Sequence, residues 1–141
     1  RSFKKRIVGL SMYVWFSSLG FPHNTLQFPY KRQSPITKRN KDYCNLKEVE
    51  DEIINLSDTF KDSKFTIGRN LYFIAPLFSN PRWFIDEEYI ELIREFNYMK
   101  NYNIPIATNL NDADSYKLDC FDIIQKEITA IQQYLGEKDG R

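Results

Sequence analysis

Short, continuous apolar runs mark three places where the chain is predicted to form a strand. They are residues 6–16 (RIVGLSMYVWF), 71–75 (LYFIA) and 104–108 (IPIAT), and residues 65–68 add a short candidate before the second run. The second run is apolar on both faces, which is typical of a strand covered on both sides. Pro105 lacks a backbone donor, so the third strand is expected at a sheet edge or to begin at this proline.

Three other segments repeat their apolar residues at steps of three and four, which is the spacing of one helix face. They predict helices over about 46–60, about 86–101 and from about 120 to Gly136. Each follows a residue that can cap a helix, namely Asn45 (with Glu48 three residues later), Asp86 and Asp119. The stripes are Leu46, Val49, Ile53, Leu56 and Phe60; Tyr89, Ile90, Ile93, Phe96 and Met99; and Phe121, Ile124, Ile128, Ile131 and Leu135.

These elements alternate in the order strand, helix, strand, helix, strand, helix. Alternation of this kind favours a parallel sheet covered by helices. Residues 17–45 contain three prolines and no apolar period, so they predict an extended connection. The length of 141 residues is typical of one domain. The predicted fold class is therefore α/β, a small three-layer Rossmann-like domain with a short, mostly parallel sheet and an extended N-terminal arm.

The net charge of +1 conceals a strong segregation of charge along the chain. Residues 1–41 hold nine basic side chains and no acidic one, whereas the other 100 residues hold 11 basic and 19 acidic groups. This division predicts a basic, aromatic-rich arm including a first strand over 1–45, and an acidic α/β domain over 46–141. Opposed charges of this kind indicate an arm that meets an anionic partner or folds back on its own domain.

The arm carries the residues predicted to bind a partner. A protein partner or packing on its own domain is favoured, but basic groups interleaved with rings also suit nucleic acid or an anionic membrane surface through residues 1–41. Residues 7–21 are free of charge but shorter than a spanning helix, so they predict a core strand, with a short membrane anchor as the alternative. The predicted partner-binding residues are Lys4, Lys5, Arg6, Trp15, Lys31, Arg32, Lys38 and Arg39.

Two loops after the predicted strands are the candidate site for a small polar ligand. Ligands of open α/β sheets bind beyond the carboxyl ends of the strands, where these loops would lie together. Turn-forming residues would also occupy such loops without any ligand. The candidate ligand-binding residues are Ser79, Asn80, Arg82, Thr108, Asn109, Asp112 and Asp114.

The sequence offers no complete catalytic set, so no catalytic residue and no cofactor are predicted. It has no glycine-rich phosphate loop and no GxSxG motif. One histidine and two cysteines 76 residues apart are too few for a zinc site, so no metal is predicted. Two free thiols in a reducing intracellular compartment are favoured, with one disulfide as the alternative, and the start at Arg1 also fits a processed organellar protein.

Two short motifs resemble known families. Residues 73–77 (FIAPL) and 103–109 (NIPIATN), followed by Ala113-Asp114, resemble the C-terminal half of a methylglyoxal-synthase-like domain. Ala75 stands where that family has a catalytic Asp, and its glycine-rich phosphate loops have no counterpart. Residues 71–79 (LYFIAPLFS) are similar to the first strand and loop of a nucleoside 2-deoxyribosyltransferase. Either resemblance implies a ligand-binding fold that has lost the catalytic activity of its family.

Charge segregation without a catalytic set favours a non-catalytic subunit or adaptor of a larger assembly, attached through the basic arm. The alternative is a binding domain for a nucleoside or a phosphorylated metabolite, or a degenerate enzyme of either family.

Overall fold

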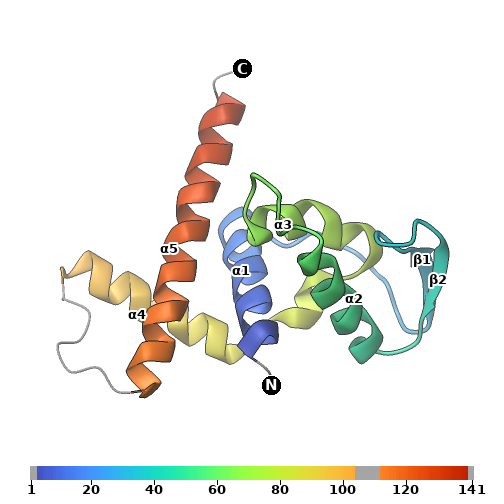
Figure 1. Cartoon of the computed structure of the whole chain (residues 1–141), viewed down its shortest axis with the longest axis horizontal. Helices are drawn as coiled ribbons and strands as arrows, with labels where there is room; N and C mark the ends of the chain where they lie inside the picture. The colour runs from blue at the N-terminus through green and yellow to red at the C-terminus, as the bar shows by residue number, and fades with distance from the viewer. Residues whose placement is uncertain (1–2, 104–111, 140–141) are drawn as a thin grey trace.

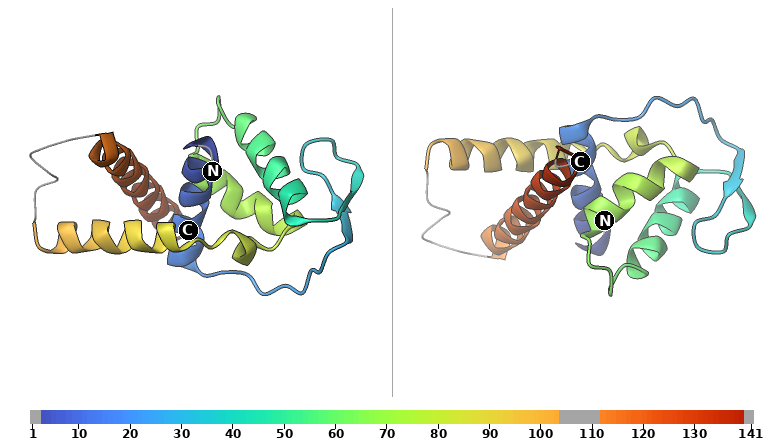
Figure 2. Two further views of the ribbon diagram at one scale, coloured as in Figure 1. Left: turned by 90° about the horizontal axis from the view of Figure 1, so that it is seen from below. Right: turned by 90° about the horizontal axis from the view of Figure 1, so that it is seen from above.

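The computed structural model describes residues 3–103 and 112–139. Most of these residues are helical, and the one sheet among them is a two-stranded antiparallel hairpin (Figure 1). The hairpin lies at the end of the molecule opposite the end of α4, and two further views agree on this placement (Figure 2). In chain order the elements are α1 (Phe3–Leu19), β1 (Tyr30–Gln33), β2 (Asn40–Tyr43), α2 (Leu46–Asp58), α3 (Ile67–Phe78), the 3-10 helix η1 (Pro81–Phe84), α4 (Glu87–Asn101) and α5 (Asp112–Asp139).

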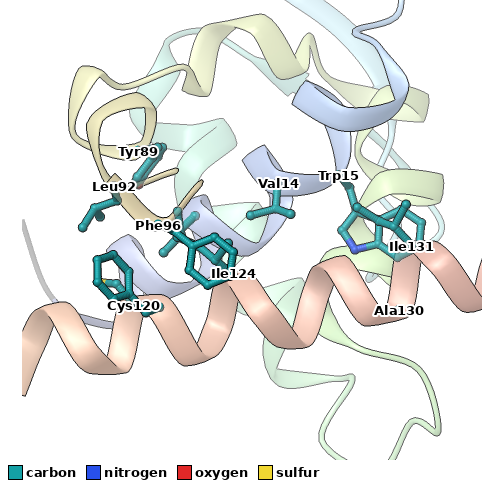
Figure 3. Close-up of a cluster of buried hydrophobic side chains, with 11 residues drawn as sticks. Val14, Trp15, Tyr89, Leu92, Phe96, Cys120, Ile124, Ala130 and Ile131 are labelled. Atoms are coloured by element: carbon teal, nitrogen blue, oxygen red, sulfur yellow. The ribbon is translucent and has the colours of Figure 1, made fainter. Parts of the chain in front are cut away.

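Helix α1 is the centre of the fold, with α3 and α5 packed against it. Between Ile7 and Phe16 its side chains are almost all apolar, as is typical of a helix surrounded by other elements. One side of α1, with Val14 and Trp15, enters a cluster with α4 and α5 that is shown in Figure 3. The other side, with Val8, Met12 and Phe16, enters a second cluster with α2, α3 and Tyr43 of the hairpin. One helix therefore joins two apolar clusters.

The predicted three-layer Rossmann-like α/β fold is wrong. Residues 6–16 form most of α1, and residues 71–75 lie within α3, so neither run is a strand. A continuous apolar run satisfies a covered strand and a covered helix equally, because both bury all their faces. The third predicted strand, 104–108, lies outside the described residues.

The extended N-terminal arm is also wrong. Residues 3–19 form a helix in the core, and Trp15 is fully buried there. Residues 65–68, the fourth strand candidate, contain Thr66, which caps α3 by accepting a hydrogen bond from the backbone of Arg69. Leu71, Ala75 and Phe78 then follow at steps of four and three, and all three are buried in the second cluster. The helical period was present in the sequence, but the intervening apolar residues masked it.

The helices predicted over 46–60 and 86–101 are confirmed as α2 and α4. Asn45 caps α2 by accepting from the backbone N–H of Glu48 at 3.0 Å. The Glu48 carboxylate accepts in return from the N–H of Cys44, at 2.6 Å. Asp86 caps α4 through the N–H of Glu88 at 2.9 Å. These ends were predictable because capping depends on groups within about four residues of one another.

Two predicted ends of the last helix are wrong. Asp119 does not cap it, since α5 already begins at Asp112, and Gly136 does not close it, since the helix runs to Asp139. The C-terminal part of α5 extends past the neighbouring helices (Figure 1). Along the helix, Phe121, Ile124 and Ile131 of the predicted stripe are buried, whereas Leu135 is exposed. Over the described residues, no helix combines the length and apolar character that crossing a bilayer requires.

Candidate functional site

Residues 30–43 form a ribbon that we call the basic hairpin. It carries five basic side chains and one acidic one. Tyr30 pairs with Tyr43 and Gln33 with Asn40 in the antiparallel register. The sequence had predicted only an extended connection here, because four-residue strands with mostly polar side chains leave little apolar alternation to detect.

Glu52 of α2 anchors the hairpin to the helix. Its side chain is almost fully buried and accepts hydrogen bonds from the hydroxyls of Ser34 and Tyr43, the second at 3.1 Å. Lys41 pairs with the same carboxylate at 3.4 Å. Ser34 also accepts from the backbone N–H groups of Ile36 and Thr37, both at 3.2 Å, and so closes the turn. One buried carboxylate thus holds both the turn and the second strand.

Aromatic rings form the other half of the base of the hairpin. Tyr30 stacks on Tyr43 with ring centroids 5.3 Å apart, and its hydroxyl donates to the carbonyl of Phe78 at 2.7 Å. Phe28 stacks on Trp83 at 4.6 Å beside them. Burial raises the pKa of Tyr30 to about 12, so this hydroxyl stays a proton donor at neutral pH. The hairpin is therefore fixed to the ends of two helices.

The basic side chains of the hairpin differ in how they are partnered. Lys31 pairs across the ribbon with Asp42 at 3.8 Å, and Lys41 pairs with Glu52. Arg32, Lys38 and Arg39 are exposed and take part in no ion pair with any described residue. Three cations without counter-charges on an anchored ribbon form a local electropositive surface.

The other predicted partner-binding residues belong to α1 and are used within the fold. Lys4 pairs with Asp58, and Arg6 lies 3.9 Å from the Glu88 carboxylate and 5.6 Å from the ring centre of Tyr116. Lys5 is half-buried. Trp15 has no surface to offer a partner, because it is fully buried.

The predicted ligand-binding residues are not gathered beyond a sheet edge. Ser79 is fully buried at the end of α3, where its hydroxyl donates to the carbonyl of Ala75 at 2.7 Å. Asn80 caps η1 through the N–H of Arg82, whose guanidinium lies 5.5 Å from the ring centre of Phe21. Thr108 and Asn109 lie outside the described residues, and Asp112 and Asp114 fall in the first turn of α5, without described side chains.

Two buried glutamates, Glu52 and Glu127, were not among the residues predicted from the sequence. Glu127 of α5 accepts hydrogen bonds from the indole of Trp15 at 2.9 Å, the hydroxyl of Thr66 and the backbone N–H of Gly68 at 3.1 Å. Burial raises the pKa of its carboxyl, while these hydrogen bonds act in the opposite direction. A signal was present, since both glutamates lie on the apolar side of their helix, Glu52 three residues after Val49 and Glu127 three residues after Ile124.

The two cysteines are free thiols in different environments. Cys44 is exposed just before α2, and Cys120 is buried in the cluster of α1, α4 and α5. Burial raises the pKa of the Cys120 thiol, which lowers its reactivity because the thiolate is the nucleophile. Within residues 3–103 and 112–139, no group of three His, Cys, Asp or Glu side chains is placed to hold a metal ion.

No protein-family model matches this chain, and neither curated proteins nor solved structures give a significant match. Residues 71–79, which carry the second resemblance and include residues 73–77 of the first, form most of α3 and its C-terminal cap, where the resemblances imply a strand and a loop.

Proposed function

We propose that this protein is a non-catalytic subunit or adaptor, attached to an acidic surface of a protein partner through the basic hairpin. The observation that carries the proposal is the set of three exposed cations, Arg32, Lys38 and Arg39, with no counter-charge among the described residues. Charge complementarity of this kind speeds encounter and selects the partner.

The anchoring of the hairpin supports a role in binding. Glu52 and Phe78 hold the ribbon to α2 and α3, so its basic side chains start from a fixed backbone. A preorganised surface loses less conformational freedom when it binds. The two buried glutamates accept hydrogen bonds from other elements of the fold and so have a structural role. This supports a binding role for the protein over a catalytic one.

The placement of aromatic rings favours a protein partner over single-stranded nucleic acid. Rings that stack on bases must be exposed. In the hairpin, Tyr43 is fully buried, and Tyr30 is half-buried against it and Trp83. The exposed apolar residue of the turn is Ile36, an aliphatic side chain near the cations. An apolar contact ringed by polar groups is typical of protein interfaces.

The test replaces the three cations by alanine, as Arg32→Ala, Lys38→Ala and Arg39→Ala together. We expect the unaltered protein to bind fluorescent poly-L-glutamate, an acidic polypeptide probe, and the variant to bind about tenfold more weakly. Raising the salt concentration should weaken binding of the unaltered protein, because the contact is exposed and charged. Fluorescence anisotropy measures both effects.

A matched control removes the same charge elsewhere, as Lys64→Ala, Lys100→Ala and Lys138→Ala, three exposed lysines on other segments. This control should bind poly-L-glutamate as the unaltered protein does. Equal losses in both variants would show a general charge effect and contradict the role of the hairpin. Tighter binding to a 20-base-pair DNA duplex or to vesicles of phosphatidylcholine and phosphatidylglycerol would assign the hairpin to those partners instead.

A further inference from the structure

A second feature is independent of the hairpin, namely a hollow of about 510 Å³ at the other end of α3. It lies among the first turns of α1, the end of α2, the connection to α3 and one turn of α5. Its walls are largely apolar, with Ile7, Phe60, Phe65 and Ile67 among them. Pockets that bind small molecules commonly have about 300–1,000 Å³ and a mostly apolar lining.

The charges around this hollow are mainly positive. Lys4, Lys61 and Lys126 line it, together with one carboxylate, that of Asp58. Lys4 uses its charge on Asp58. Lys61 and Lys126 are exposed and form no ion pair with the described residues, although the charge of Lys61 also acts on Asp58 and that of Lys126 on Glu127. Two ammonium groups without ion-pair partners therefore stand beside an apolar cavity.

One hydroxyl in the lining also has an unused proton. Ser63 accepts hydrogen bonds from the backbone N–H of Phe65 and the amide of Asn70, both at 3.1 Å. Its own proton is donated to no described group. A serine hydroxyl donates one hydrogen bond as well as accepting, so Ser63 can donate to an anionic oxygen.

We propose that this hollow binds a free fatty acid, with the acyl chain against the apolar walls and the carboxylate at Lys61, Lys126 and Ser63. Charge complementarity selects the head group, because two ammonium ions and a hydroxyl proton together stabilise a carboxylate. The apolar walls select the tail, since burial of each CH₂ contributes about 0.8 kcal/mol. The ligand class is thus an unbranched amphiphile with one anionic end.

The experiment titrates the whole chain with dodecanoate, below its micelle concentration, by isothermal titration calorimetry. Two probes with the same tail serve as comparisons, namely uncharged 1-dodecanol and cationic dodecyltrimethylammonium. We expect saturable one-to-one binding of dodecanoate, at least about tenfold tighter than of 1-dodecanol, and the weakest binding of the cation. Backbone amide shifts in NMR spectra should concentrate at Ile7, Ser63 and Ile67.

The double variant Lys61→Ala and Lys126→Ala should lose this preference for the carboxylate while keeping the affinity for 1-dodecanol. Lys138→Ala, on the same helix as Lys126 but more than three turns away, is the matched control and should change nothing. Both replaced lysines are exposed, so the fold is expected to survive.

The inference would be overturned by no binding of dodecanoate at millimolar concentration, by equal affinity for dodecanoate and 1-dodecanol, or by amide shifts away from the hollow. Binding to phosphatidylglycerol vesicles without binding of free dodecanoate would also overturn it, in favour of a membrane surface. The hairpin variant with Arg32, Lys38 and Arg39 replaced should bind dodecanoate normally, which separates this inference from the proposed function.

Discussion

At the scale of single residues, the buried carboxylate of Glu127 joins three helices of the fold. One carboxylate in α5 accepts hydrogen bonds from α1 and from the start of α3, where Gly68 allows the close approach. A Cβ at position 68 would lie 2.6 Å from the indole of Trp15 and 2.7 Å from this carboxyl. Negative charge at the first turn of a helix is favourable, yet burial of the charge costs free energy.

The raised pKa of Glu127 predicts a pH dependence of stability. Burial raises this pKa above its ordinary value of 4.5, so the folded state binds more protons than the unfolded state just above that pH. The contribution of Glu127 to the free energy of unfolding therefore falls as pH rises from about 4.5 through the folded pKa, by at most about 1.4 kcal/mol per pH unit.

The variant Glu127→Gln, which has no charge to bury, isolates this contribution. Urea unfolding of both proteins between pH 4 and pH 8 gives a difference in free energy of unfolding at each pH. As pH rises, the free energy of unfolding of the unaltered protein should fall relative to that of the variant. If the free energy of unfolding of the unaltered protein stays constant or rises relative to that of the variant, the hydrogen bonds to the carboxylate outweigh its burial.

At the scale of elements, the crossing of α1 and α4 depends on a missing side chain. Gly9 lies in α1, and a Cβ there would stand 2.2 Å from the hydroxyl oxygen and 2.8 Å from the ring of Tyr89 in α4. Glycine in a helix lowers its stability by about 1 kcal/mol relative to alanine. At position 9 this loss accompanies the close packing of α1 against α4. Tyr89 is 2% exposed, and a buried ring has little room to move aside.

Alanine at two glycines should therefore have opposite effects. Gly9→Ala should lower the free energy of unfolding by about 1–3 kcal/mol, because α1 and α4 must separate. Gly136→Ala is the control, since nothing lies within 4 Å of a Cβ there, and it should raise stability by up to about 1 kcal/mol. Urea unfolding measures both. Stabilisation by both substitutions would contradict the close crossing of α1 and α4.

At the scale of the whole molecule, the basic N-terminal segment is divided between the core and the surface. Its first part forms α1, whose six buried apolar side chains are shared between the two clusters; they are Val8, Leu10, Met12, Val14, Trp15 and Phe16. Each such side chain contributes about 1.5–3 kcal/mol when buried, which in sum rivals the total stability of about 5–15 kcal/mol of a typical domain.

Removal of residues 1–20 should therefore abolish cooperative unfolding. Circular dichroism in urea should show a broad change without a sharp midpoint, because both clusters lose their shared helix. Removal of residues 136–141 is the control and should keep a sharp transition, since residues 136–139 are exposed. A cooperative transition after the first truncation would contradict the central place of α1. For the same reason, the role of the hairpin is tested by substitution of its exposed cations and not by removal of the N-terminal segment.

Local signals were enough to predict α2 and α4, because a capping side chain and an apolar stripe act within a few residues of each other. Charge was enough to single out Lys31, Arg32, Lys38 and Arg39, since composition alone shows where basic residues gather. The same reasoning included Lys4 and Arg6, which the fold pairs with Asp58 and Glu88. Which cations lack counter-charges depends on residues far away in the chain.

The sequence by itself determined where α2 and α4 begin and how basic residues are distributed. Only the tertiary structure decided that the runs at 6–16 and 71–75 are helices. An apolar run gains its burial energy from any covered conformation, so its secondary structure follows from what surrounds it. Tertiary contacts also turned Glu52 and Glu127 into buried anchors, because a carboxylate is stable inside a protein only where donors from distant segments meet it.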